Sequence, residues 1–377
     1  MALIVISTIA GLLTLFYVGI VFHFKRGWNK LPQFVPDAAV PVTRVSILIA
    51  ARNEEDKIPF TIEDILKQNY PQGLVELIVI DDHSTDRTAN IVEWYANSGV
   101  KLIKLHEDKA LNSYKKKAIT EAINQSNGEL IITTDADCRM GTEWLRTIVS
   151  FYEKNNFKMI SSPVAYFGEK TLFERLQSLE FSYLIGLGAA SIGNKQPSTC
   201  NGANLAYRRD VFFELKGFQG IDNLASGDDE LFLHKVAGKY PDGIGFCKSR
   251  YAIVRTDAKP NLKEFIRQRK RWASKSTKYK DKRIVALGVS IWVFNVLIFL
   301  HAILGFFDPS FWIFLGLIVL LKAFSEYTFL RKITRFAGRS DLLKLLPLLT
   351  LIHVIYMIYI GVAGNSGKYV WKDRLVR

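Results

Sequence analysis

Long apolar runs lie near both ends of the 377-residue chain, and shorter apolar runs alternate with polar ones between them. Residues 3–22 contain no charged side chain and are long enough to cross a bilayer. No basic region precedes this run and no Ala-x-Ala site follows it, so we interpret it as an uncleaved signal anchor. Lys25, Arg26 and Lys30 come next, and the positive-inside rule then places the N-terminus outside and the next domain in the cytoplasm.

From residue 44 onward, short runs typical of strands alternate with longer runs that have helical spacing. The predicted strands are 45–50, 77–80, 102–105 and 130–134. The predicted helices are 54–67, 85–96 and 115–124. Alternation of strand and helix is typical of α/β proteins built from βαβ units around a mostly parallel sheet. Ligands of such sheets bind at the carboxyl ends of the strands.

Polar clusters follow three of these predicted strands: 51–55 (ARNEE), 81–86 (DDHSTD) and 135–137 (DAD). Because the carboxyl ends of parallel strands meet at one edge, we expect the clusters to line one cleft. In an extended Asp-x-Asp, the side chains of Asp135 and Asp137 lie on the same side of the backbone. Two such carboxylates favour a hard divalent cation that also contacts phosphate oxygens. The alternative is a solvated turn, since Asp is common in turns.

The second half of the middle region holds three further signals. Residues 169–192 have apolar positions at helical spacing, which fits either a core helix or a helix lying at the membrane surface. The cluster 227–230 (GDDE) precedes an apolar run, where acidic side chains either complement a helix dipole or supply a general base. Residues 262–283 are strongly basic directly before an apolar span, so anionic lipid headgroups are their expected partner.

The C-terminal part carries the remaining apolar runs. Residues 284–307 form a second predicted span, 311–321 an apolar return that is short for a span, and 345–362 a last run that contains Pro347. Four full spans from an outside N-terminus would leave the basic tail outside, against the positive-inside rule. Either one C-terminal segment is re-entrant or interfacial, or the tail is an exception to the rule.

Composition narrows the classes of function. The formal net charge is +14, but much of it lies in the run before the second span, so we expect a membrane partner and no nucleic acid. Cys138, Cys200 and Cys247 lie far apart without metal-type spacing, which indicates reduced thiols in a cytosolic compartment. The chain has no G-x-G-x-x-G after the first strand and no G-x-x-x-x-G-K-[ST], which argues against dinucleotide binding and against a P-loop nucleotidase.

The acidic pair, the second acidic cluster and the basic helix, in this order, resemble the membrane-bound family 2 inverting glycosyltransferases. That family includes cellulose, hyaluronan and poly-N-acetylglucosamine synthases and, more distantly, ceramide glucosyltransferase. The resemblance covers about residues 44–280. Asp135-Ala136-Asp137 matches the family's Asp-x-Asp, and residues 268–272 (QRKRW) match Q-x-x-R-W in full. Residues 227–229 (GDD) match its Thr-Glu-Asp triplet in charge but lack the hydroxyl.

The resemblance implies a GT-A type fold, with a Rossmann-like, mostly parallel sheet and flanking helices. One N-terminal and two or three C-terminal transmembrane helices accompany it. The implied parts are an anchor (1–24), a linker (25–43), a cytoplasmic glycosyltransferase domain with interfacial helices (44–283), a transmembrane region (284–365) and a basic tail (366–377). The protein would be a multi-pass component of the cell (inner) membrane.

The resemblance also implies roles for single residues. The implied contacts of the nucleotide-sugar donor are Arg52, Glu54, Asp82, Lys115 and Asp135, although Tyr114 replaces the family's glycine before the lysine. Asp135 and Asp137 would hold Mg²⁺ or Mn²⁺, and Asp229 would be the general base. The implied contacts of the substrate or acceptor are Asp228, Gln268, Arg271 and Trp272.

The implied reaction moves a sugar from a nucleotide diphospho-sugar, a UDP-sugar first of all, to a glycan or lipid acceptor with inversion. One hypothesis is a processive or short-chain polysaccharide synthase. A second is a non-processive transferase that adds one sugar to a lipid, which the modest C-terminal spans favour. A third is a non-catalytic membrane subunit that binds a nucleotide sugar. The third hypothesis predicts missing catalytic carboxylates, whereas both acidic clusters are present.

Overall fold

The computed structural model describes residues 2–37, 39–106, 113–224, 226–275, 279, 281–364, 369–371 and 374–376. The chain forms two compact units. The apolar-helix unit contains Met1–Trp28, Glu169–Gly186 and Ala258–Tyr369. The sheet unit contains Asn29–Gly168, Leu187–Asp257 and Val370–Arg377. Each unit is therefore assembled from separate stretches of the chain.

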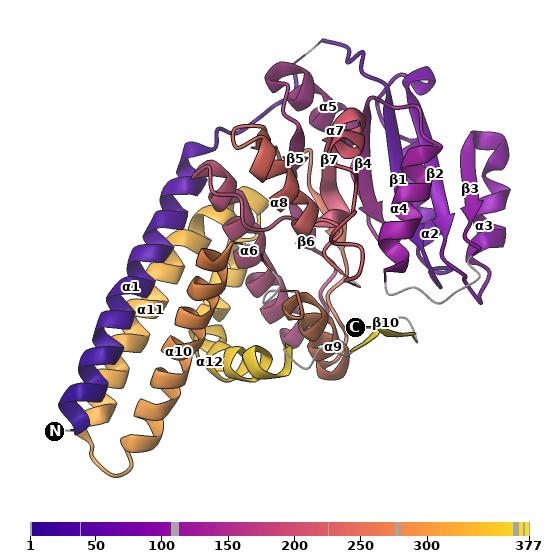
Figure 1. The fold of residues 1–377 in the computed structure, drawn as a ribbon. Helices are drawn as coiled ribbons and strands as arrows, with labels where there is room; N and C mark the ends of the chain where they lie inside the picture. Colours follow the sequence, from indigo (N-terminus) through magenta and orange to yellow (C-terminus); the bar gives the residue numbers. More distant parts are fainter. Residues whose placement is uncertain are drawn as a thin grey trace. The chain divides into compact units, whose positions relative to one another are not determined.

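The sheet unit is built on a seven-stranded sheet in the order β3-β2-β1-β4-β7-β5-β8 (Figure 1). Its strands are β1 (Val45–Ala51), β2 (Val75–Asp81), β3 (Val100–Lys104), β4 (Leu130–Asp135), β5 (Met159–Ser161), β7 (Leu205–Arg208) and β8 (Ile244–Phe246). Strands β1 to β4 are parallel, whereas β7 is antiparallel to both β4 and β5. A separate parallel pair joins β6 (Val164–Tyr166) to β9 (Val254–Thr256). The predicted mostly parallel sheet with flanking helices is confirmed.

The parallel strands arise from continuous apolar runs because both faces of the sheet are covered. In β1, Ile47, Leu48 and Ile49 are all buried, as expected of a strand between two layers of helices. The helices of this unit are α2 (Ile58–Leu66), α3 (Thr88–Trp94), α4 (Tyr114–Asn124), α5 (Trp144–Asn155), α7 (Arg209–Glu214) and α8 (Glu230–Lys239). Short 3₁₀ turns lie at Gln72–Leu74 (η1), Ala96–Ser98 (η2) and Gly202–Asn204 (η3). The C-terminal residues add β10 (Tyr369–Trp371) and β11 (Arg374–Val376).

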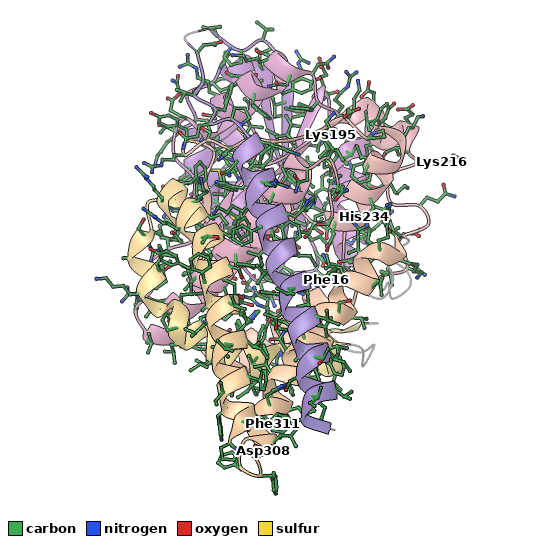
Figure 2. The ribbon with its side chains drawn as sticks, turned by 90° about the vertical axis from the view of Figure 1, so that its left-hand side faces the viewer. Phe16, Lys195, Lys216, His234, Asp308 and Phe311 are labelled. Atoms are coloured by element: carbon green, nitrogen blue, oxygen red, sulfur yellow. The ribbon has the colours of Figure 1, made fainter. Side chains whose placement is uncertain are left out.

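The apolar-helix unit contains α1 (Ala2–Lys30), α6 (Leu172–Gly193, through Gly186), α9 (Leu262–Ala273), α10 (Lys282–Leu304), α11 (Ser310–Ala337), η5 (Ser340–Leu345) and α12 (Leu346–Ala363). Among the residues that the structure describes, four helical segments are long and apolar enough to cross a membrane: α1, α10, α11 and η5 with α12. Figure 2 shows α1 beside the α10–α11 hairpin, with Asp308 at the turn of the hairpin and Phe311 just after it.

Helix α11 corrects the prediction of a short apolar return at 311–321, because the helix continues to Ala337. The charged residues that follow the apolar run do not end the helix. Lys322 and Glu326 are both buried, and Nζ of Lys322 lies 2.6 Å from Oε1 of Glu326, one turn along the same helix. The hydroxyl of Tyr17 on α1 also donates a hydrogen bond to Glu326 Oε1 at 2.5 Å. Neighbouring side chains therefore compensate these charges within the bundle.

Candidate active site

The polar clusters after β1 and β2 lie against each other at the carboxyl edge of the sheet. The guanidinium of Arg52 donates hydrogen bonds to the backbone carbonyls of Asp82 (2.8 Å) and His83 (2.6 Å). The side-chain oxygen of Asn53 accepts a hydrogen bond from the Thr85 backbone N–H at 2.8 Å. Both Asn53 and His83 have positive φ, 51° and 57°, which side chains other than glycine adopt rarely. Two of the three clusters expected to meet at this edge of the sheet are therefore in contact.

The second loop also contacts helix α4. Asp82 is buried, and its Oδ1 lies 3.1 Å from Nδ1 of His83. The ring of Tyr114, the first residue of α4, stands edge-on to the His83 ring with 6.0 Å between centroids. The large side chain at position 114 thus packs on the loop that carries Asp82.

Glu54 of the first loop is partly buried, and its backbone N–H donates to Oγ1 of Thr88 at 2.8 Å.

The turn after β4 differs from the extended Asp-x-Asp that the sequence predicted. Strand β4 ends at Asp135, and the backbone N–H of Cys138 donates to the Asp135 carbonyl at 3.3 Å, which closes a turn. Thr61 fixes this turn from α2, because its hydroxyl lies 2.8 Å from the carbonyl oxygens of both Ala136 and Cys138. The prediction of extended geometry at Asp137 is therefore wrong, since Thr61 and the turn hydrogen bond take the place of strand pairing.

The two acidic clusters meet at Lys115. Its Nζ lies 2.8 Å from Oδ1 of Asp135 at the end of β4 and 3.4 Å from Oδ2 of Asp228. Burial lowers the pKa of Lys115, but the charges of Asp135 and Asp228 outweigh this effect and raise the pKa above its usual value. The ammonium group is therefore held protonated between the carboxylates.

Asp137 acts on a different cation, Lys57. The Nζ of Lys57 lies 2.9 Å from Oδ2 of Asp257, the residue after β9. Burial lowers the pKa of Lys57. The hydrogen bond to Asp257 and the charge of Asp137 raise it by more, so the pKa lies above its usual value. Asp135 thus forms an ion pair with Lys115, whereas Asp137 raises the pKa of Lys57 through its charge.

The oxygen ligands at this edge of the sheet fit a divalent cation only if substrate phosphates and water supply further ligands. Among the residues that the structure describes, no three Asp, Glu, His or Cys side chains are grouped so that they could hold a metal ion. Asp135 and Asp137 are both partly exposed and carry hard oxygen donors. Mg²⁺ and similar ions are commonly bound by one or two carboxylates together with substrate phosphates and water. Asp135 and Asp137 supply oxygen donors of the type that such a site uses.

Asp229 lies at the N-terminus of α8, with its carboxylate fixed by two backbone N–H groups. Its Oδ1 accepts from Glu230 N at 2.6 Å and its Oδ2 from Gly202 N at 3.0 Å. The hydroxyl of Thr133 on β4 donates to the Gly202 carbonyl at 2.8 Å, which ties this loop to the sheet. A Cβ atom at Gly202 would lie 3.4 Å from Asp228 Oδ2 and 3.6 Å from Asp229 Oδ2, in ordinary van der Waals contact, so this glycine lies directly beside both acids.

Gly202 is a site residue that the sequence predictions did not include, whereas the resemblance placed Lys116, like Lys115, where the family has a phosphate-contacting lysine. Lys116 is buried, and its Nζ donates to the backbone carbonyls of Ile221 (2.6 Å), Leu224 (2.6 Å) and Ser226 (2.9 Å). The only sequence signal for Gly202 was the small polar loop 200–204 before an apolar run. No sequence pattern distinguishes Lys116 from its two neighbouring lysines.

The Q-x-x-R-W residues belong to the apolar-helix unit, whereas the residues described above belong to the sheet unit. In α9, Arg269 forms a buried ion pair with Glu180 of α6, with 2.6 Å between Nη2 and Oε2. Its guanidinium lies 4.2 Å from the ring centroid of Trp272 and donates to Oε1 of Gln268 at 2.7 Å. Gln268 and Trp272 thus pack around an arginine inside the motif, and the roles of Gln268, Arg271 and Trp272 stay predictions.

Residues 46–215 match the sequence profile described as "Glycosyl transferase family 2". This stretch of the chain is similar to the family 2 glycosyl transferases. The matched stretch covers β1 to β4, β7 and the loops that hold Arg52, Asp82, Lys115, Asp135 and Asp137. The residues at Asp228 and Asp229 lie just beyond the matched range.

Two curated relatives extend the comparison. The chain is 31% identical over 149 residues to "Beta-monoglucosyldiacylglycerol synthase" of Nostoc sp., and the match covers 40% of this chain but only 30% of that protein. It is 28% identical over 332 residues to "Probable glycosyltransferase YdaM" of Bacillus subtilis, with 77% of this chain and 75% of that protein covered. The similarity to the first relative therefore covers less than half of either protein, whereas the similarity to the second covers most of both.

A solved structure shares the fold over almost the whole chain. It is the mannosyltransferase PcManGT from Pyrobaculum calidifontis in complex with GDP-Man and Mn²⁺, with a TM-score of 0.55 and 18% identity. The match covers 95% of this chain and 97% of that one. This similarity confirms the GT-A type fold that the sequence predicted.

Proposed function

We propose that this protein is a membrane glycosyltransferase that moves a sugar from a nucleotide diphospho-sugar to a lipid acceptor with inversion at the anomeric carbon. The observation that carries the proposal is the convergence of both acidic clusters on Lys115, with Asp229 next to Asp228. A donor diphosphate needs positive charge and a metal ion on one side, and an acceptor hydroxyl needs a base on the other. This edge of the sheet holds residues for both tasks.

The donor side of the proposed site contains Asp135, Asp137 and Lys115. The two carboxylates would hold Mg²⁺ or Mn²⁺, and the bound ion would neutralise negative charge on the leaving diphosphate. Lys115 adds a protonated ammonium group that the carboxylates already fix in place. Charges fixed before the reaction stabilise a developing anion without reorganisation during the reaction. Arg52 and Asp82, joined through the paired loops, would receive the nucleotide, and we propose a UDP-sugar as donor.

Asp229 is the proposed general base. Its carboxylate would take the proton from the acceptor hydroxyl as that oxygen attacks the anomeric carbon, while the bond from this carbon to the diphosphate oxygen breaks. One displacement from the opposite face inverts the configuration, so an α-linked donor gives a β-linked product. The N–H groups of Gly202 and Glu230 hold the carboxylate in one orientation, which favours proton transfer because geometry limits general base catalysis.

A lipid acceptor is our first choice because α1, α10 and α11 are long enough to keep the enzyme in a membrane and a relative is named as a glycolipid synthase. The catalytic face would be cytoplasmic, where sugar nucleotides are made, since Lys25 and Arg26 follow the first apolar run. A growing polysaccharide is the second candidate acceptor, supported by the Q-x-x-R-W motif of α9. Both candidates use the same chemistry and differ in product length.

The test is release of UDP by the full-length protein in detergent, with a panel of UDP-sugars, membrane lipid extract and Mn²⁺ or Mg²⁺. We expect turnover with one donor that stops when a chelator is added, and one sugar per lipid in the product. Products of many sugars would favour the polysaccharide instead. GDP-mannose is added to the panel as a donor without uridine, and turnover with GDP-mannose alone would contradict the proposed UDP-sugar.

The variant Asp229→Asn separates the base from donor binding. We expect sugar transfer to fall by about 10²- to 10⁴-fold, the usual contribution of a general base, with donor affinity retained. Asp242→Asn is the matched control, because Asp242 is highly exposed in a surface pair with Lys195 and should leave turnover unchanged. Undiminished turnover of Asp229→Asn would remove Asp229 as the base.

A further inference from the structure

Helix α12 has no Asp, Glu, Lys or Arg among its 18 residues, and both of its ends contact neighbouring helices of the same unit. At its start, Leu346 packs in a cluster with Leu330 of α11, and Oγ1 of Thr350 lies 3.4 Å from Oε2 of Glu326. Near its end, the indole N–H of Trp292 on α10 donates to the Ile358 carbonyl at 3.2 Å. These contacts fix the direction of α12 relative to α10 and α11.

The contacts at the two ends of α12 lie at nearly the same position along the axes of α10 and α11, which is called a level of the bundle below. Tyr17 marks this level, because its ring stacks on Phe294 of α10 with 4.8 Å between centroids and its hydroxyl bonds to Glu326 of α11. Leu330 is one turn from Glu326, and Trp292 is two residues from Phe294. The start of α12 and its end are therefore held at similar positions along α10 and α11.

A helix parallel to the bundle could not make these contacts. Residues 346–361 extend about 22 Å at 1.5 Å per residue, so the ends of a parallel helix would meet positions about 15 residues apart along α10 and α11. A Cβ atom added to Gly361 would instead lie 2.2 Å from the Trp292 ring, close to the Tyr17 level. Helix α12 thus lies across the bundle rather than along it.

Helix α9 runs beside α12 in the same direction. The ring of Phe265 lies 5.5 Å from that of Tyr356, and a Cβ atom on Gly364 would lie 2.5 Å from Cβ of Ala273. Both contacts are separated by eight residues on each helix, as expected of two helices side by side. Figure 1 shows α12 between α9 and the α10–α11 pair. Helix α9 is strongly basic, which is typical of a helix among anionic headgroups.

Charged residues place this level at one face of the membrane. Between the Tyr17 level and the nearer ends of α1 and α11 lie Lys25, Arg26, Arg331, Lys332 and Arg335. The opposite end of the α10–α11 hairpin carries Phe306 and Phe307, which are 80% and 83% exposed. By the positive-inside rule, the basic end and α12 are cytoplasmic.

We propose that α12 lies in the plane of the cytoplasmic leaflet, where it contacts acyl chains, and that only α1, α10 and α11 cross the membrane. A row of exposed apolar side chains along α12 forms the lipid contact: Leu348, Leu351, Ile352, Ile355, Tyr359 and Val362. The basic tail then returns to the side of Lys25 and Arg26. This topology removes the conflict between four spans and the positive-inside rule, and it does not depend on the proposed reaction.

Depth measurements with spin labels test the orientation of α12. Cys138, Cys200 and Cys247 are replaced by serine, and single cysteines at Leu348, Ile355 and Val362 receive a nitroxide in protein reconstituted in anionic vesicles. We expect equal accessibility to oxygen and to a water-soluble quencher at all three positions. A spanning helix would give depth steps of about 10 Å between positions seven residues apart, and this gradient would overturn the proposal.

Labelling from one side tests the topology independently. In the same cysteine-free background, a single cysteine is placed at Phe307, at Lys25 or after Arg377. With an impermeant maleimide on intact spheroplasts, we expect labelling only at position 307. Inside-out vesicles should react at position 25 and at the C-terminal cysteine. Labelling of the C-terminal cysteine in spheroplasts would show a fourth crossing.

A second inference concerns Lys116, the buried neighbour of Lys115. An ammonium group has three N–H donors, and those of Lys116 meet the carbonyls of Ile221, Leu224 and Ser226. These residues come directly before the acidic cluster that contains Asp228 and Asp229. We infer that Lys116 is a positioning residue, which holds the acidic loop against the first turn of α4; this inference rests on the proposed function of Asp229.

The test compares Lys116→Met with Lys117→Met. Lys117 lies on the same turn but is half-exposed, 3.9 Å from Glu121, so its substitution should change nothing. For Lys116→Met we expect kcat to fall at least tenfold, with a change below threefold in the KM for the donor. We also expect faster hydrogen exchange of the amides at 221–229, and partial recovery of both readouts in Lys116→Arg.

The outcomes separate the two proposals. Unchanged kcat and unchanged exchange in Lys116→Met would overturn the positioning role. Absence of turnover in the wild type with every donor would count against the proposed function, whereas the exchange comparison would still decide whether Lys116 holds the loop. If Lys116→Met fails to fold, the same comparison in Lys116→Arg decides the matter, since a shifted loop should exchange faster there than in Lys117→Met.

Discussion

Three adjacent lysines on the first turn of α4 occupy three different environments. Lys115 contacts carboxylates, Lys116 contacts backbone carbonyls, and Lys117 pairs with Glu121 on the helix surface. The sequence indicates a basic helix start but not these differences, because the partners come from residues 135 and 221–228. At this scale the acidic residues could be predicted, since their types cluster at strand and helix ends. The contacts of Gly202 and Lys116 could not, because Gly202 acts through its own backbone N–H and Lys116 binds the backbone carbonyls of a distant loop.

Removal of the Lys115 charge should weaken donor binding. In Lys115→Met, Asp135 and Asp228 lose their shared cation and a diphosphate would meet uncompensated negative charge. We expect the Kd for UDP to rise about 10- to 100-fold, in line with the 1.5–3 kcal/mol of a hydrogen bond to a charged group. Calorimetric titration of Lys115→Met and Lys117→Met measures the difference. Equal affinities would show that Lys115 does not contact the diphosphate.

The cysteines should differ in reactivity. Burial raises the pKa of Cys138, the charges of Asp137 and Asp135 add to this effect, and burial also raises the pKa of Cys247. A raised pKa leaves less thiolate at a given pH, so at pH 8 both thiols should react with iodoacetamide more slowly than Cys200, which is partly exposed. Mass spectrometry of the folded protein gives the three rates, and unfolded protein is the control. Similar rates in folded protein would contradict the prediction.

At the scale of elements, strand length decided what could be predicted. Strands β1, β2 and β4 are six or seven residues long and buried, so their apolar runs stand out. Strands β5 and β8 have three residues each and form only because neighbours already present a sheet edge. Helix α11 was predicted only over its apolar half, because compensation of Lys322 by Glu326 and Tyr17 depends on another helix.

The buried pair in α11 should stabilise the bundle only while both partners are present. Lys322→Met would leave Glu326 buried without its ammonium partner, and loss of one member of a buried pair costs about 3–5 kcal/mol. We expect a clear fall in melting temperature in detergent for Lys322→Met. The double variant Lys322→Met/Glu326→Leu should recover most of the loss, and Lys344→Met is an exposed-surface control. A double variant as unstable as the single one would contradict this account.

At the scale of the molecule, the chain enters the apolar-helix unit three times, at its start, at residues 169–186 and at residues 258–369. Alternation of strand and helix predicted the sheet unit well. It could not predict that the segment of α6 belongs with the apolar helices, since a core helix and a membrane-surface helix have the same pattern. Leu179 packs with Leu330, Leu342 and Leu346, which only the folded chain brings together.

A fragment of residues 29–257 should therefore depend on detergent. It retains the whole sheet but exposes Leu179 and Phe181, which lose the cluster around Leu330 and the ring of Trp272. We expect the fragment to aggregate in buffer and to be monodisperse in detergent, as judged by size-exclusion chromatography. The same fragment with Leu179→Ser and Phe181→Ser should need less detergent. A monodisperse unmodified fragment in plain buffer would contradict the prediction.

The hydrogen bond from Tyr17 to Glu326 joins residues 309 positions apart. During synthesis, α1 leaves the ribosome long before its partner exists. At about 5–20 residues per second, the wait lasts about 15–60 s. Throughout this time the Tyr17 hydroxyl has no Glu326 to bind, so the membrane part completes its packing only after α11 has been inserted. A ribosome stalled before residue 326 would hold a chain whose sheet can already form but whose first helix still lacks its partner.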